Sequence, residues 1–238
     1  WFALDRAARN DFDGDRACDI AAYDASGALW YVWSLARGCC LAGGLPCGAP
    51  GAEPAPGDYD GDGADEVAAY EAARGLWYAY SIAGPGAVVW ARSWGWSQAA
   101  AVPGDYDNSD AVDLAVFGED SGLWYVAGVD GGVVAWAEPW GGAGFAPVAA
   151  DYDADGCTDL AVYDHASGLW YVLSLAGGVL AWAEPWGFPG VVPVAGDYDG
   201  DGAADRAVFD PASGSWYVRS ARGAVLAWGE PWGFPGAV

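Results

Sequence analysis

The apolar residues of this chain fall into short runs, separated by turns rich in Gly, Pro and Asp. The runs contain about five to eight residues and are rich in Val, Tyr, Trp and Ala, a composition typical of β-strands. The segment LWYVLSL at 169–175 is mostly apolar at both alternating sets of positions, which indicates a strand buried on both faces. No segment sustains a helical period, so the pattern predicts an all-β protein.

The whole pattern repeats five times with a period of 46–47 residues. Each repeat holds an acidic segment followed by strand-like runs, and these segments begin at Asp11, Asp58, Asp105, Asp151 and Asp197. Four short strands at this period are typical of one blade of a β-propeller. We therefore predict a five-bladed β-propeller with four antiparallel strands per blade.

The repeats place the blades at defined stretches of one expected propeller domain over residues 1–238. The approximate bounds are 1–48, 49–95, 96–141, 142–187 and 188–238. Residues 2–10 are the candidate for the first strand of the first blade. The last segment, WGFPGAV, resembles the link that precedes each following blade, so it either closes the ring onto the first blade or meets another copy head to tail.

The acidic segments carry oxygen ligands at a regular spacing. In the fifth repeat, carboxylates stand at positions 1, 3, 5 and 9, and Gly202 at position 6 permits a sharp turn. Ca²⁺ accepts six to eight oxygen ligands in flexible geometry, whereas Mg²⁺ demands a stricter octahedron, so the pattern favours Ca²⁺. Position 12 is Ala or Val in a strand and not the Glu of an EF-hand, so each segment is interpreted as a structural clip between strands.

Up to five Ca²⁺ ions are expected, one in each acidic loop. In loops two to five, the residue at position 7 is included for its carbonyl oxygen. Loops two, four and five are expected to bind best, because Arg16 replaces the turn glycine of loop one and Ser109 replaces a carboxylate of loop three. The predicted ligands are Asp11, Asp13, Asp15, Asp19, Asp58, Asp60, Asp62, Ala64, Glu66, Asp105, Asp107, Ser109, Ala111, Asp113, Asp151, Asp153, Asp155, Cys157, Asp159, Asp197, Asp199, Asp201, Ala203 and Asp205.

With these motifs, the chain resembles the FG-GAP/VCBS repeat family, whose members include the integrin α-chain propeller and fungal propeller lectins. The segments DYDGDGAADRAVFD at 197–210 and PVAGDYDG at 193–200 carry the resemblance. It implies a β-propeller fold with Ca²⁺ bound at the acidic residues named above. The chain departs from the family in having five repeats, where seven blades are usual.

The charge and composition limit the classes of partner. The formal net charge is −24, and no basic cluster exists, so we expect no nucleic acid partner. Hydrophobic residues make up 54% of the chain, which is enough for a core, but no apolar run reaches the roughly 20 residues of a membrane-spanning helix. Membrane insertion is therefore not expected.

The cysteines and tryptophans supply further candidates. Cys39, Cys40 and Cys47 lack the paired spacing of a zinc site, so a disulfide within this cluster is favoured, as in a secreted protein. Most Trp residues are expected to pack between blades. The competing hypothesis is that Trp residues of the Pro-Trp-Gly loops stack on sugars, and the candidates are Trp140, Trp186 and Trp232.

Catalytic motifs are missing from the sequence. The only histidine, His165, lies in a predicted hairpin turn, and no nucleophile elbow or phosphate-binding loop occurs. We therefore expect no enzyme, but a secreted, calcium-stabilised module that binds a glycan or an extracellular protein outside the cell or at its surface. The alternatives are a subunit of an extracellular fibre or surface layer that assembles from copies of itself, and an accessory domain of a larger secreted protein.

Overall fold

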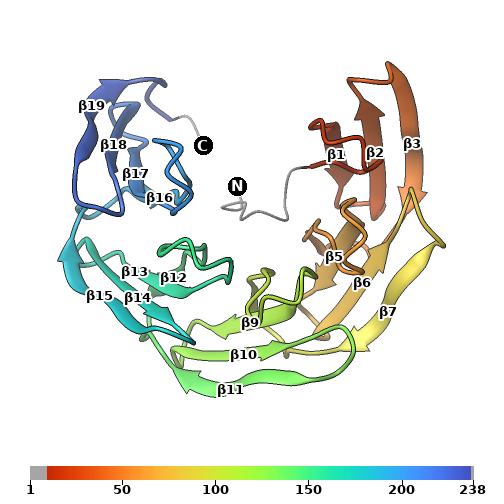
Figure 1. Ribbon diagram of the computed structural model, residues 1–238, viewed down its shortest axis with the longest axis horizontal. Helices are drawn as coiled ribbons and strands as arrows, with labels where there is room; N and C mark the ends of the chain where they lie inside the picture. Colours follow the sequence, from red (N-terminus) through yellow and green to blue (C-terminus); the bar gives the residue numbers. More distant parts are fainter. Residues whose placement is uncertain (1–9, 237–238) are drawn as a thin grey trace. The chain divides into compact units, whose positions relative to one another are not determined.

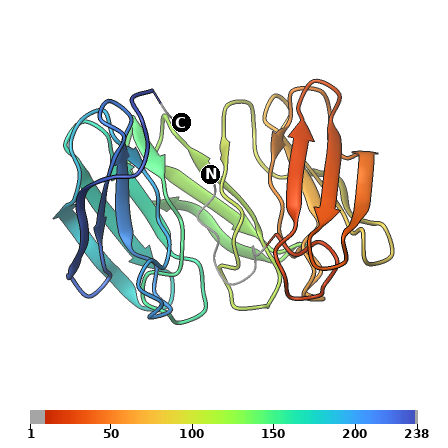
Figure 2. The same ribbon diagram turned by 90° about the horizontal axis from the view of Figure 1, so that it is seen from above.

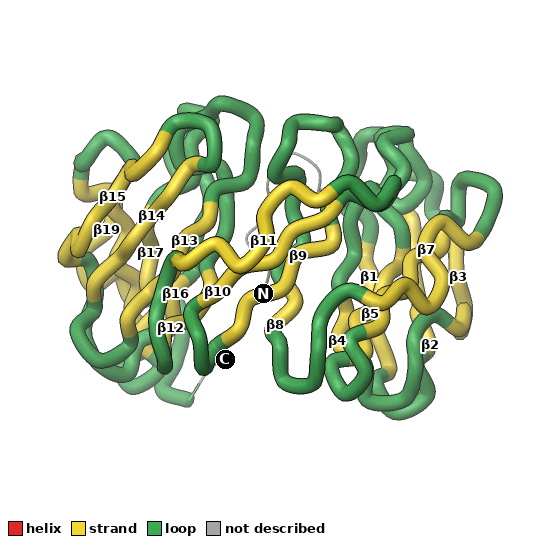
Figure 3. Tube along the Cα trace, turned by 90° about the horizontal axis from the view of Figure 1, so that it is seen from below, coloured by secondary structure: helices red, strands yellow, loops and turns green. Residues whose placement is uncertain are grey.

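The structure is a computed structural model that describes residues 10–236, and this part of the chain consists of strands and loops without helices (Figure 1 and Figure 3). The strands form five antiparallel sheets, one in each repeat, which confirms the all-β, five-bladed propeller fold. No helix in the described residues could cross a membrane.

Strand order within each sheet follows the order of the chain. The strands are, sheet by sheet, β1 (Ile20–Asp24), β2 (Leu29–Ser34) and β3 (Cys39–Pro46); β4 (Glu53–Pro54), β5 (Val67–Glu71), β6 (Leu76–Tyr80) and β7 (Ala87–Ser93); β8 (Ala100–Ala101), β9 (Leu114–Gly118), β10 (Leu123–Ala127) and β11 (Val133–Pro139); β12 (Phe145–Pro147), β13 (Leu160–Asp164), β14 (Leu169–Ser174) and β15 (Gly178–Pro185); β16 (Val192–Pro193), β17 (Arg206–Asp210), β18 (Ser215–Arg219) and β19 (Val225–Pro231).

The first sheet has three strands among the described residues, which Figure 2 shows side by side in red and orange. The strand expected within residues 2–10 falls almost entirely outside the described part of the chain. Each sheet lies within one of the predicted blade boundaries.

The described chain divides into two compact units. One holds residues 10–118 and 124–138, and the other holds residues 119–123 and 139–236. Each unit contains hydrophobic clusters of its own. The expectation of a single domain over residues 1–238 stays a prediction.

The cores are built from strands that are buried on both faces, as the apolar runs predict. In the fourth blade, Tyr163 pairs with Trp170 across β13 and β14, and both side chains are fully buried. Trp170 donates its indole N–H to the carbonyl of Trp186 at 2.6 Å. The next residue, Gly187, has φ +148° and lies so close to the Tyr163 hydroxyl that a Cβ atom would overlap it, which explains the glycine after this tryptophan.

Backbone hydrogen bonds between acidic loops join neighbouring blades within each unit. The N–H at loop position 8 donates to the carbonyl at position 1 of the loop in the preceding blade, at 2.6–2.7 Å. These bonds run from Asp65 to Asp11, from Val112 to Asp58 and from Ala204 to Asp151. The acidic loops are therefore part of the contact between blades and are not isolated surface turns.

Candidate metal centres and aromatic sites

All five acidic loops fold around the carboxylate at position 1. Its two oxygens accept the backbone N–H groups of positions 5 and 6, at 3.1–3.2 Å and 2.7–3.1 Å respectively. The carboxylate at position 9 accepts the N–H of position 2 at 2.7–3.0 Å. Each loop thereby turns its acidic side chains toward one centre before any cation is considered.

The residue at position 6 has positive φ in all five loops, whether or not it is glycine. Arg16 and Asp110 have φ values of 69° and 65°, in the left-handed region that the glycines of the other loops also occupy. Both retain the hydrogen bond to the position 1 carboxylate. The side chain is therefore tolerated at some backbone strain, and loops one and three keep the common geometry.

Each loop brings together three carboxylates whose nearest oxygens lie within 4.8 Å of one another. Positions 1 and 3 contribute in every loop, joined by position 5 in loops one and two and by position 9 in loops three, four and five. The groups are Asp11, Asp13 and Asp15; Asp58, Asp60 and Asp62; Asp105, Asp107 and Asp113; Asp151, Asp153 and Asp159; Asp197, Asp199 and Asp205. The structure thus provides one candidate metal centre per blade.

The other predicted ligands lie beside these groups. Asp19 and Glu66 bond the backbone N–H at position 2 of their loops. Asp62, Asp155 and Asp201 accept the N–H of position 7, and the donors are Ala64, Cys157 and Ala203. In loop three, the Ser109 hydroxyl reaches the carbonyl of Ala111 at 3.5 Å.

Buried carboxylate oxygens without a hydrogen bond test whether a cation fits these loops. Oε1 of Glu66 and Oδ1 of Asp159 lack a hydrogen-bond partner, and both residues are 0% exposed. Burial raises the pKa of Glu66 to about 8 and that of Asp159 to about 7, and neighbouring aspartates add to both shifts. Buried carboxylates need a compensating charge, and hard oxygen donors suit a hard cation. The residues therefore fit a metal ion.

The predicted disulfide is not formed. All five cysteines are free. Cys39 and Cys40 begin β3, whereas Cys47 follows its last residue. An extended strand rises about 3.3 Å per residue, so Cys40 and Cys47 are roughly 20 Å apart, whereas a disulfide requires Cα atoms within about 7 Å. Cys47 is instead buried, and its thiol donates to the carbonyl of Val67 at 3.3 Å.

The candidate Trp residues of the Pro-Trp-Gly loops have different environments. Trp140 and Trp186 are 7% and 8% exposed, and each donates its indole N–H at 3.2 Å to the carbonyl of a tyrosine in the following blade. Trp232 is 80% exposed. The first two therefore pack between blades, and Trp232 is the one whose ring is free to contact a partner.

A second set of tryptophans, which the sequence analysis did not single out, faces outward from the last strand of four blades. Trp90, Trp136, Trp182 and Trp228 are 61–72% exposed. The residue after each has positive φ, as at Ala137 with 55°, and the strand register shifts at this bulge where the pairing is recorded for β7, β15 and β19. The signal in the sequence was their identical place in each repeat, four residues before the Pro-Trp or Ser-Trp tryptophan.

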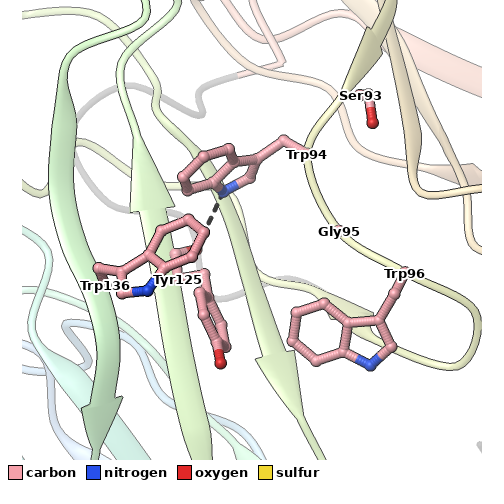
Figure 4. A pocket seen from close by; sticks show the side chains of 6 residues that line it. All are labelled: Ser93, Trp94, Gly95, Trp96, Tyr125 and Trp136. Carbon is pink, nitrogen blue, oxygen red and sulfur yellow. Dashed lines mark hydrogen bonds between the residues drawn. The ribbon is translucent and has the colours of Figure 1, made fainter.

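The outward tryptophans build aromatic sites. In Figure 4, Trp94, Trp96, Tyr125 and Trp136 surround a cavity of about 520 Å³, together with Ser93 and Gly95. Tyr125 and Trp136 meet edge to face with centroids 5.2 Å apart, and Trp94 contacts Trp136 at 5.8 Å. The other compact unit repeats this three-ring arrangement twice, in Trp140–Tyr171–Trp182 and Trp186–Tyr217–Trp228.

Comparison with known proteins shows the fold but no family. No protein-family model matches the chain, and no curated protein matches it either. A streptogramin B lyase structure is similar over 92% of this chain and 67% of that chain, with a TM-score of 0.58 and 12% identity. Virginiamycin B lyase from Staphylococcus aureus is similar over 89% and 69%, with a TM-score of 0.55 and 12% identity. BBS1N in complex with ARL6DN is similar over 95% and 68%, with a TM-score of 0.53 and 16% identity.

The prediction that the chain is not an enzyme is wrong. Two of the similar structures are lyases, so this fold also serves catalysis, and the lack of familiar sequence motifs does not exclude it. At 12% identity the likeness concerns the fold alone and assigns no catalytic residue here.

Proposed function

We propose that this chain is a secreted, calcium-stabilised β-propeller of the FG-GAP/VCBS type that binds a glycan at the outer aromatic sites. The proposal rests chiefly on the cavity formed by Trp94, Trp96, Tyr125 and Trp136. A pyranose ring presents a face of C–H groups that packs on aromatic rings, and an exposed aromatic cavity of this size suits one or two sugar units.

The acidic loops support the calcium part of the proposal. Ca²⁺ would be held by the carboxylates of the five groups, and its charge would offset the repulsion among them. Calcium-binding modules outside the cell work with dissociation constants as weak as about 10⁻⁴–10⁻³ M, so sites of even modest affinity would be filled outside the cell or at its surface. The resemblance of the acidic segments to FG-GAP/VCBS repeats also supports calcium binding.

Glycan-array screening followed by calorimetry tests the binding function. The triple variant Trp136→Ala, Trp182→Ala, Trp228→Ala should lose affinity for the selected glycan by about tenfold or more, because stacked aromatic residues dominate such contacts. Trp90→Ala is the matched control. Trp90 occupies the same strand position, but Cys47 replaces the tryptophan that would complete its aromatic site. Equal loss in the control, or no glycan bound by the parent chain, would contradict the proposal.

A second candidate function is head-to-tail assembly into a fibre or surface layer. Trp232 and Phe234 of the last blade are 80% and 68% exposed, whereas the equivalent Trp140 and Trp186 are covered by a following blade. In the first blade, Tyr31 and Trp33 are 44% and 47% exposed. Light scattering should then detect calcium-dependent polymers that Trp232→Ala abolishes. A parent chain that stays monomeric at high concentration excludes this candidate.

A further inference from the structure

The turn after the second long strand of a blade carries residues at equivalent positions in blades one, two and four. Each turn follows a buried serine whose Oγ accepts the N–H of the residue three positions later. The donors are Arg37 to Ser34 at 3.2 Å, Gly84 to Ser81 at 2.7 Å and Gly177 to Ser174 at 3.0 Å. Arg37, Gly84 and Gly177 therefore occupy the same place in their blades.

A side chain at this place points toward the acidic loop of its own blade. A Cβ atom on Gly84 would lie 3.7 Å from Oδ2 of Asp62, and one on Gly177 would lie 3.5 Å from Oδ2 of Asp153. In blade one the side chain exists. Nε of Arg37 lies 3.1 Å from Oδ2 of Asp13 and 3.7 Å from Oδ2 of Asp15.

The Arg37 guanidinium is thus held in the candidate metal centre of loop one. Its Nη2 also donates to the carbonyl of Asp13 at 3.0 Å. Asp13 has a side chain only 3% exposed, so the positive charge acts on a buried carboxylate. Oδ1 of Asp13 and Oδ1 of Asp19 remain without hydrogen bonds, so loop one keeps ligand atoms that an ion could use if Arg37 were removed.

Loops two and four have the opposite arrangement. Among the described residues, no arginine forms an ion pair with Glu66 of loop two or Asp159 of loop four. These loops contain the fully buried Glu66 and Asp159, each with an oxygen that lacks a hydrogen bond. In blades two and four, glycine at the turn is therefore found together with a buried carboxylate that has an oxygen without a hydrogen bond.

We propose that the residue at this turn position selects the cation of loops one, two and four: Arg37 is a built-in counter-cation that weakens divalent binding in loop one, whereas Gly84 and Gly177 leave loops two and four to bind divalent ions more tightly. The inference rests on the proposed function in taking the ions to be Ca²⁺. It divides sites that share one motif into two affinity classes.

Arg37→Ala tests the counter-cation role through both calorimetry and thermal unfolding. Calcium titration should show about fivefold tighter binding at one site, since a partly exposed ion pair contributes up to about 1 kcal/mol. In chelator, the melting temperature of Arg37→Ala should fall by about 2–4 °C, and saturating Ca²⁺ should remove this deficit. Arg74→Ala is the control, because Arg74 pairs with Glu71 outside the acidic loops.

The reciprocal variant, Gly177→Arg, should make loop four resemble loop one. Gly177 has no positive φ, so the backbone accepts a side chain there. One tight Ca²⁺ site should weaken about fivefold or more, and stability in chelator should rise. Unchanged calcium affinity in both variants would overturn the inference, as would an Arg37→Ala deficit that Ca²⁺ does not remove. If the parent chain binds no Ca²⁺, the proposed function fails, and a deficit of Arg37→Ala in chelator still reports the counter-cation role separately.

Discussion

Loops two and five share the sequence DYDGDGA, at 58–64 and 197–203, but not the same surroundings. The tyrosine at position 2 is 1% exposed in loop two and 45% exposed in loop five. Loop two bonds to the loops of both neighbouring blades, through Asp65 on one side and Asp58 on the other. Among the described residues, loop five bonds only to the loop before it, through Ala204.

The difference extends to the acidic groups. In loop two, Oε1 of Glu66 lacks a hydrogen bond, whereas in loop five Oδ1 of Asp205 accepts the N–H of Ala221 at 2.9 Å. Arg222 also lies 3.3 Å from Oδ2 of Asp201. Oδ2 of Asp201 also lacks a hydrogen bond, but it has the Arg222 charge beside it. We therefore expect loop two to depend on an external cation more than loop five. If the loops bind metal, burial by neighbouring blades should influence how strongly each loop depends on it.

Removal of calcium should have the largest effect on this comparison. Each ion that binds only the folded state stabilises it by roughly 2.7 kcal/mol at 100 times its dissociation constant. Chelator should therefore lower the melting temperature strongly, and hydrogen exchange should accelerate more at 58–66 than at 197–205. Identical melting with Ca²⁺ and with chelator would refute the calcium assignment.

Glu66→Gln should have the next largest effect. Glutamine cannot supply the carboxylate that would hold the ion, so the substitution should abolish most of the calcium-dependent stabilisation of loop two, about 2.7 kcal/mol, while leaving the chelated protein about as stable as the parent. Asp205→Asn, the matched change in loop five, should lose less. Chemical denaturation of both variants with and without Ca²⁺ measures the difference, and a larger loss for Asp205→Asn would reverse the comparison.

The metal-free protein should become less stable as the pH rises. Burial raises the pKa of Glu66 from 4.5 to about 8, so between these values the folded state binds more protons than the unfolded state. The free energy of unfolding must then fall from about pH 5 to about pH 8. Calcium should oppose this trend, because its ligands bind deprotonated. Urea titrations across this range should show a shallower slope for Glu66→Gln. Burial also raises the pKa of Asp205, so Asp205→Asn should change the slope in the same direction.

Arg222→Ala should have the smallest effect. The Arg222 side chain is 77% exposed, so solvent screens its pair with Asp201. We expect a change below about 1 kcal/mol, seen as a slightly tighter calcium site in loop five. Calorimetric calcium titrations of Arg222→Ala and Arg37→Ala compare the changes in affinity at the two sites. A larger effect for Arg222→Ala would mean that exposure does not govern these pairs.

The fold could be predicted from local patterns, because the same strand-like runs and turns recur every 46–47 residues. The acidic groups were predictable for the same reason, since alternate carboxylates around a sharp turn converge regardless of tertiary contacts. The expectation that loops one and three bind more weakly stays a prediction, and hydrogen bonds to Asp11 and Asp105 hold Arg16 and Asp110 at the positive φ that position 6 requires.

The remaining features depend on contacts that spacing does not encode. Proximity in sequence suggested a bond from Cys47 to Cys39 or Cys40, but the intervening residues form one extended strand. Burial of Trp140 and Trp186 depends on the following blade, and the outward-facing Trp182 lies at a bulge. The role of Arg37 emerges only when its turn is placed over the loop of the same blade.

The hydrogen bonds between successive loops make blade stability a nearest-neighbour property, as in linear repeat proteins. The Asp58 carbonyl belongs to the loop that would hold an ion, and it also accepts the N–H of Val112 from the next blade. An ion that orders loop two would therefore also order the carbonyl to which blade three bonds. Loss of that ion should therefore destabilise the neighbouring blade as well. The occupancy of one loop would then influence how cooperatively its neighbours unfold.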